Sequence, residues 1–137
     1  LEILIPIMKK QGYGTIAGVT SLADVRGYGG SSSYSASKAA GSILLEAARV
    51  ELKKHNIRVI TVRPGFVKTA MTDKNEFKMP LLMQPPKAAR IIRKKIEKGR
   101  SLVQFPWPIV MATRLIKIIP NWIYDWGMNM ARPVKKK

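Results

Sequence analysis

The sequence contains no cysteine and a single histidine, His55. The lack of cysteine excludes disulfide bonds and thiolate metal sites, and it is compatible with a reducing cytosol. One histidine cannot form a histidine pair around a metal, and Asp73 with Glu76 is too small a ligand set. We therefore expect no metal site, and we expect His55 to be an exposed residue at a helix end.

Acidic residues are scarce: eight Asp and Glu stand against 25 Lys and Arg, which gives a net charge of +17. Such an excess attracts phosphate backbones and anionic lipids. The densest basic block is 87–100, where apolar residues recur at helical spacing and predict one buried face with the charges in solvent. Those apolar residues are Ala88, Ala89, Ile92 and Ile96. Aromatic residues do not alternate with the basic ones, as base stacking requires, so nucleic-acid binding is the weaker interpretation.

Long uninterrupted apolar runs are absent as well. The stretch 107–137 is rich in aliphatic residues and holds the three tryptophans, but Arg114, Lys117 and Pro120 interrupt it before about 18 apolar residues accumulate. It is therefore poorly suited to cross a bilayer. Its tryptophans and closing lysines are typical of peripheral contact with a membrane surface. Packing over a binding site or against a second subunit explains the same residues equally well.

The pattern along the chain alternates strands with helices. With 46% hydrophobic residues in 137, the chain is too apolar for disorder and long enough for one domain. Strands are expected at 15–20, 57–63 and 101–105, and helices at 1–11, 34–54, 85–98 and from 107 onward with a break at Pro120. A glycine- and serine-rich loop is expected at 21–33, and an irregular methionine-rich segment at 66–84. This order predicts an α/β fold with a parallel sheet and helices on its faces.

Three polar residues form the most informative group in the sequence. Tyr34 and Lys38 stand four residues apart in YSASK, thirteen positions after Ser21. Residues four apart share one face of a helix, so the phenol and the ammonium can point into one site. A nearby cation favours an ionised phenol, which makes a tyrosine a usable proton donor and acceptor. A serine hydroxyl can hydrogen-bond a reacting oxygen while its charge changes. The group suits carbonyl–alcohol oxidoreduction.

The segments GTIAGVTS, YSASK with the helix after it, and PGFVKT closely resemble the short-chain dehydrogenase/reductase family through nearly the whole chain. The resemblance implies a Rossmann-like, doubly wound parallel sheet and hydride transfer between a nicotinamide and a substrate carbonyl. It implies that Tyr34 exchanges the proton, while Lys38 stabilises the ionised tyrosine and binds the nicotinamide ribose. By the same resemblance, Ser21 orients and polarises the substrate oxygen.

The resemblance also implies a cofactor site in PGFVKT, which would hold the nicotinamide end. The residues concerned are Pro64, Gly65, Phe66, Val67 and Thr69. The expected cofactor is NAD(P). NADP is slightly favoured, but the choice stays open, because the residues that select it in this family follow a second strand that the sequence does not show.

One departure from the family concerns its glycine-rich strand–loop–helix, which holds the dinucleotide pyrophosphate. Gly12, Gly14 and Gly18 lack its spacing, and the family's asparagine-containing segment is not found either. A βα repeat takes about 30 residues, so we expect this chain to be the C-terminal part of a longer parent enzyme. Its first strand would then form an unpaired sheet edge. We expect the chain alone to fold poorly and to bind a dinucleotide weakly or not at all.

Segment 66–84 is expected to be the substrate loop, as the resemblance implies. Its apolar residues would form a lid over an apolar ketone, aldehyde or acyl-chain substrate, although packing into the core explains them equally well. They are Phe66, Met71, Phe77, Met79, Leu81, Leu82 and Met83.

The whole chain, 1–137, is expected to be a single partial domain with an apolar and basic extension at 107–137. The family resemblance implies a homodimer or homotetramer formed through helix 34–54 and its N-terminal neighbour. No secretory signal is visible at the start of the sequence, so a cytoplasmic location is expected, with membrane contact left open. The alternative function is that of a noncatalytic basic fragment associated with a membrane surface or nucleic acid.

Overall fold

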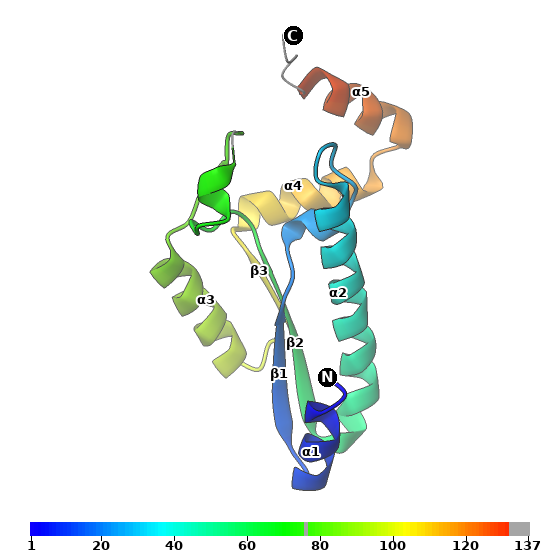
Figure 1. Ribbon diagram of the computed structural model, residues 1–137, viewed down its shortest axis with the longest axis vertical. Helices are drawn as coiled ribbons and strands as arrows, with labels where there is room; N and C mark the ends of the chain where they lie inside the picture. Colours follow the sequence, from blue (N-terminus) through cyan, green and yellow to red (C-terminus); the bar gives the residue numbers. More distant parts are fainter. Residues whose placement is uncertain (76, 132–137) are drawn as a thin grey trace.

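The computed structural model describes residues 1–75 and 77–131. Three parallel strands form one sheet in the order β1–β2–β3 (Figure 1). They are β1 (Gly14–Val19), β2 (Ile57–Pro64) and β3 (Leu102–Phe105). The helices are α1 (Leu4–Gln11), α2 (Ser32–Leu52), α3 (Pro85–Glu97), α4 (Trp107–Ile118) and α5 (Asn121–Ala131), with short 3-10 helices η1 (Leu22–Asp24), η2 (Lys53–His55) and η3 (Thr72–Lys74). The predicted α/β fold with a parallel sheet is confirmed.

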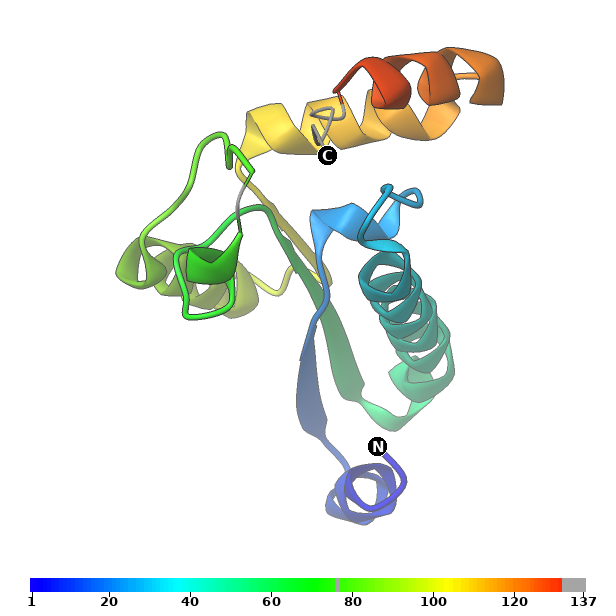
Figure 2. The same cartoon turned by 45° about the horizontal axis from the view of Figure 1, so that its top comes forward.

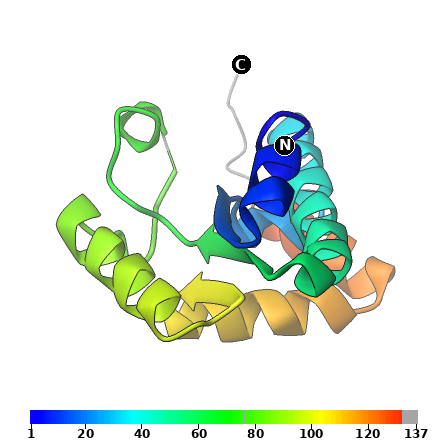
Figure 3. The ribbon, with the colours of Figure 1, turned by 90° about the horizontal axis from the view of Figure 1, so that it is seen from below.

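Strand β2 lies at the centre of the sheet and is buried on both faces, so its apolar residues are nearly continuous rather than alternating. Ile57 and Val59 of β2 pack with Ile16 of β1 and with α2. Ile60 and Val62 pack with β3 and α3. Figure 3 shows α1 and α2 on one side of the sheet and α3 on the other. The result is a helix–sheet–helix sandwich with two small cores.

Helix α2 packs on the sheet mainly over β2, and a glycine of β1 makes room for one of its large side chains. A Cβ added at Gly18 would stand 2.3 Å from Cδ1 of Leu45, a buried residue of α2. Ala48, one turn further along α2, is buried in the same core. The small residues of this helix and of β1 therefore bring the helix axis near the sheet, which holds the start of α2 at the end of β1.

Helix α3 carries the dense basic block. Pro85 and Pro86 occupy its first turn, where a missing backbone N–H costs nothing. Ala88 is buried, and the helix packs on the sheet through Ile91, Ile92 and Ile96. The expectation of a buried Ala89 is wrong, since that residue is exposed and Ile91 takes its place on the inner face. The basic side chains lie in solvent, as a solvated charged face requires.

Helices α4 and α5 follow β3 and lie beyond the carboxyl ends of the strands, where β1 also runs into η1 (Figure 2). Val110 and Thr113 of α4 are buried, and this helix packs on β3 and η1. Within residues 1–75 and 77–131, no helix is both long enough and apolar enough to cross a membrane.

Strand β1 lies at one edge of the sheet. Its ladder joins it to β2 from Gly14, opposite Ile57, to Val19, opposite Val62. In the part of the chain that the structure describes, no strand pairs with its other side. That side therefore presents unpaired backbone groups, as the sequence predicts.

Candidate active site

The candidate site lies where the parallel strands end, the edge at which open α/β sheets bind their ligands. Ser21 directly follows β1 and Thr20, and its side chain caps η1. The Ser21 hydroxyl oxygen accepts a hydrogen bond from the Ala23 N–H at 3.1 Å. Because this bond uses an oxygen lone pair, the hydroxyl proton of Ser21 stays free to be donated elsewhere.

Tyr34 and Lys38 lie in the first two turns of α2, a helix that also contacts η1. The Lys38 ammonium stands 5.7 Å from the centroid of the Tyr34 ring, within the range of a cation–π contact. Tyr34 is 38% exposed, so its phenol is open to a ligand. The structure thus brings the phenol and the ammonium together. Among the described residues, no hydrogen bond joins Ser21 to either of them.

A buried ion pair fixes the loop that carries Ser21. Asp24 of η1 accepts hydrogen bonds from Arg63, near the end of β2, and from Ser42 of α2. Only 2% of the Asp24 side chain and 18% of the Arg63 side chain is exposed. The Ser42 hydroxyl also lies 2.9 Å from that of Thr20. This network ties η1, α2 and β2 together around the candidate site.

The proline–glycine segment leaves the sheet directly beside this network. Pro64 ends β2, and the N–H of Gly65 donates to the Phe105 carbonyl at 2.7 Å. A Cβ added at Gly65 would stand 3.0 Å from Cδ of Pro106 and 3.4 Å from the Phe105 oxygen. The glycine therefore lets the chain pass close to the end of β3 as it leaves the core.

The segment from Phe66 to Met83 forms a loop whose two ends pair with each other. Met83 donates its N–H to the Phe66 carbonyl at 2.9 Å, and its carbonyl accepts from Lys68 at 2.9 Å. Inside the loop, the Thr69 N–H donates to the Thr72 hydroxyl at 2.7 Å, and that hydroxyl bonds the Val67 carbonyl. Surface loops whose ends lie close together are frequently functional.

The apolar residues of this loop divide into two groups. Met83 is buried in the core beside α3, so core packing explains that residue. The rings of Phe66 and Phe77 meet edge to face with centroids 6.0 Å apart. Core packing does not explain the four residues of the loop that are exposed, which are Met71, Phe77, Leu81 and Leu82.

Arg26 forms a second link to the site, and the sequence carried no signal for it. Its guanidinium donates to the carbonyls of Ile116 at 2.9 Å and Ile119 at 2.5 Å, and to the Asn121 side chain. It also stacks 4.1 Å from the centroid of the Tyr124 ring. The Tyr124 hydroxyl in turn donates to the Gly27 carbonyl at 2.7 Å. We call these contacts the Arg26 staple; they join the loop after Ser21 to the junction of α4 and α5.

Tyr28 is another phenol in the loop after Ser21. Burial raises the pKa of Tyr28, and the neighbouring Tyr124 and Asp24 raise it further. Both influences favour the neutral phenol. Tyr28 is therefore harder to ionise at neutral pH, which argues against a role in proton exchange. His55 lies at the end of η2, as expected, and its side chain is partly exposed.

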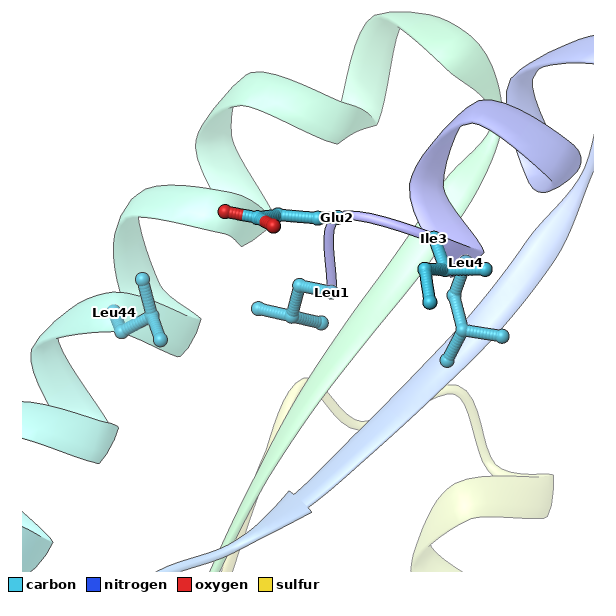
Figure 4. Close-up of a pocket in the computed structure, with 5 residues that line it drawn as sticks. All are labelled: Leu1, Glu2, Ile3, Leu4 and Leu44. Carbon is cyan, nitrogen blue, oxygen red and sulfur yellow. The ribbon is translucent and has the colours of Figure 1, made fainter.

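An open apolar hollow lies elsewhere, between the start of α1 and α2 (Figure 4). Its lining residues are Leu1, Glu2, Ile3, Leu4 and Leu44. Leu44 stands ten residues after Tyr34 on α2, which is about 15 Å along the helix. The hollow is therefore separate from the candidate site, and Glu2 is the one ionisable side chain among its lining residues.

The donor groups at the strand ends fit the nicotinamide end of a dinucleotide. Lys38 offers N–H donors to ribose hydroxyls, Thr69 carries a hydroxyl, and the 64–69 segment runs from the end of β2. Residues 1–75 and 77–131 show no glycine-rich strand–loop–helix that could hold the pyrophosphate. The described residues thus fit one half of the cofactor.

Comparison with known proteins places this geometry in context. A family model described as short chain dehydrogenase matches residues 1–79. An uncharacterized oxidoreductase of Myxococcus xanthus is 41% identical over 132 residues, which cover 96% of this chain and 52% of that protein. The 3-oxoacyl-(acyl-carrier-protein) reductase FabG of Thermotoga maritima is 35% identical over 99 residues, which cover 72% of this chain and 37% of that enzyme.

Solved structures agree with the sequence relatives. A short chain dehydrogenase from Burkholderia cenocepacia, crystallised with NADP, superposes with a TM-score of 0.73 at 26% identity. The match covers 93% of this chain and 51% of that one. The chain therefore spans about half the length, or less, of the relatives it matches.

Proposed function

Because the chain belongs to the short-chain dehydrogenase family, we propose that it carries the catalytic part of an NAD(P)-dependent oxidoreductase that interconverts a carbonyl and an alcohol. The observation that supports this most directly is the Lys38 ammonium 5.7 Å from the exposed Tyr34 ring, at the carboxyl edge of a parallel sheet. The proposal concerns this chain together with a dinucleotide-binding segment, a combination that we call the complete enzyme.

In the proposed mechanism, each residue of the group has one role. A nicotinamide cofactor, when bound, supplies the hydride for reduction or accepts it in oxidation. The Tyr34 hydroxyl gives its proton to the carbonyl oxygen during reduction and takes it back from the alcohol during oxidation. Lys38 stabilises negative charge on the phenol and hydrogen-bonds the ribose. Ser21 donates its free proton to the reacting oxygen, since its own oxygen already accepts from Ala23.

The cofactor form and the substrate class are finer proposals. We favour NADP, because the Burkholderia cenocepacia relative was solved with it. The segment 64–69 would hold the nicotinamide end. The exposed apolar loop residues favour an apolar ketone, aldehyde or acyl-chain substrate, and one relative is named as a 3-oxoacyl reductase. The noncatalytic alternative gains nothing from the relatives, which are oxidoreductases.

A homodimer or homotetramer is part of the proposal. Ile43, Leu44 and Val50 of α2 are exposed, as are Leu4 and Ile7 of α1. Exposed apolar side chains in such numbers on two neighbouring helices favour contact with a second subunit. The assembly would leave Tyr34 and Lys38, at the other end of α2, open to substrate.

The test replaces Tyr34 by phenylalanine in the complete enzyme. Loss of the phenolic proton should lower kcat by about 100- to 10,000-fold, the usual contribution of a positioned acid or base, while cofactor affinity changes little. Tyr28→Phe is the matched control and should keep most of the activity. Turnover is followed by NADPH oxidation with a panel of apolar ketones. Unchanged kcat in Tyr34→Phe would contradict the assigned role.

A further inference from the structure

Helices α4 and α5 carry large apolar side chains that the described part of the chain leaves uncovered. On α4 they follow helical spacing along one face, at Trp107, Met111, Leu115 and Ile118. On α5 they recur every four residues, at Trp122, Trp126 and Met130. We call these seven residues the α4–α5 stripe. The three tryptophans are 75%, 74% and 66% exposed, in order along the chain.

The stripe is not the inner face of these helices. The inner face of α4 is formed by Val110 and Thr113, which are buried against the sheet end. Tyr124 of α5 is held over the guanidinium of Arg26. Both helices therefore already have their packing partners. The stripe lies on a different face from those contacts. Packing into the core of this fold therefore does not account for it.

From residue 107 onward the charged residues of the sequence are almost all basic. Arg114 and Lys117 are exposed on α4, and four of the six residues after α5 are basic. Between 107 and 137, Asp125 is the single acidic residue in the sequence. An apolar protein partner would not require this excess of positive charge. An anionic lipid surface satisfies both features, because it accepts apolar side chains below its headgroups and attracts Lys and Arg at them.

The residue types also match a lipid surface. Tryptophan is enriched where apolar and aqueous phases meet, since its ring is apolar and its N–H needs a polar partner. All three tryptophans of the chain lie in the stripe. We propose that α4 and α5 attach the protein peripherally to an anionic phospholipid surface, with the stripe inserted at the headgroup level. This inference does not depend on the proposed enzymatic function.

The test follows tryptophan emission and sedimentation with lipid, because all three tryptophans of this chain lie in the stripe. The complete enzyme is titrated with vesicles of phosphatidylcholine alone and with vesicles in which about one lipid in three is phosphatidylglycerol. With the anionic vesicles we expect tryptophan emission to move to shorter wavelength and the chain to pellet with the lipid. Binding should weaken as salt is added, because electrostatic attraction contributes to it.

Two double variants make the test specific. Trp122→Ser with Trp126→Ser removes two stripe residues and keeps Trp107 as a reporter. Tyr13→Ser with Leu102→Ser is the matched control, because these residues are 61% and 47% exposed and lie outside both the stripe and the proposed subunit contact. We expect the stripe variant to lose at least about tenfold in vesicle partitioning and the control to lose less than about twofold. Both change only exposed side chains, so the helices should persist in circular dichroism.

Three results would overturn the proposal. The first is the absence of binding to anionic vesicles. The second is an equal loss in both double variants, which would mean that exposed apolar residues bind lipid without preference for the stripe. The third is short-wavelength emission that grows with protein concentration in the absence of lipid. That result would mean that a second copy of the chain covers the stripe.

Discussion

At the scale of single residues, Asp24 holds the candidate site together. It accepts from Arg63 and Ser42, and only 2% of its side chain is exposed. A buried charge keeps its place only when it is paired and hydrogen-bonded. Removing one partner leaves the other charge buried and uncompensated, which costs much more than the pair contributes when intact.

Asp24→Ala should therefore lower the free energy of unfolding by about 3–5 kcal/mol, because Arg63 is left without its partner. The matched control is Glu97→Ala, which removes the i,i+4 pair with Arg93; that pair is 82% and 58% exposed. It should cost less than about 1 kcal/mol. Both changes in the free energy of unfolding are to be measured by urea unfolding of the complete enzyme. A cost for Asp24→Ala as small as that of the control would show that the pair is not structurally important.

Some of these residues could be predicted from the sequence and others could not. Tyr34 and Lys38 are four apart, so helical periodicity alone places them on one face. Asp24 and Arg63 are separated by 39 residues, and their pairing depends on how η1 docks on β2. Local spacing carries no signal for such a contact. The roles of Ser21, Tyr34 and Lys38 stay predictions until the Tyr34 variant is measured.

At the scale of elements, the apolar runs and the glycine and proline positions predicted the helices and strands to within a few residues. Helix α2 begins at Ser32 rather than at Tyr34, because the serine-rich end of the loop adopts helical conformation. The loop 21–33 also contains the turn η1, which Ser21 caps. A helix of this length is too short to show an apolar repeat in the sequence, so neither the helix nor its cap could be predicted.

The Arg26 staple joins two elements about 90 residues apart, and it can be tested at that scale. Arg26→Ala should raise the hydrogen-exchange rates of the α5 amides by about tenfold or more, since hydrogen bonds from a charged donor contribute about 1.5–3 kcal/mol. Arg26→Lys should recover only part of the protection, because an ammonium cannot reproduce the planar fork of donors. Helix α3 is the internal control. Equal exchange in α5 of both variants and the parent would contradict the staple.

At the scale of the whole molecule, two observations bear on cofactor binding. One side of β1 has no strand partner among the described residues, and the chain spans about half the length of its relatives. In the proposed function the described residues would hold the nicotinamide end of the cofactor, and they show no glycine-rich strand–loop–helix for its pyrophosphate. A dinucleotide bound to them would lose the contacts of its phosphates with a helix N-terminus. The expectation that the isolated chain folds poorly stays a prediction, as does its partial-domain organisation.

We expect the 137-residue chain alone to bind NADPH at least about 100-fold more weakly than the complete enzyme does, because half of the contacts are missing. Isothermal titration of NADPH into each of the two proteins gives the ratio of their dissociation constants. Lys38→Met in the complete enzyme serves as a reference, because it removes one nicotinamide-side contact and keeps the phosphate contacts. Tight binding by the chain alone would mean that its own residues supply a phosphate site.

The Arg26 staple gives a physical route by which lipid attachment and substrate binding can influence each other. It connects the loop after Ser21 to the same helices that carry the stripe. Contact of α4 and α5 with lipid could favour the conformation in which the Arg26 contacts are made. The loop after Ser21 would then be more ordered, and substrate affinity would rise. Thermodynamic linkage then requires substrate to tighten attachment to lipid by the same factor. One arginine would make surface recruitment and substrate occupancy cooperative.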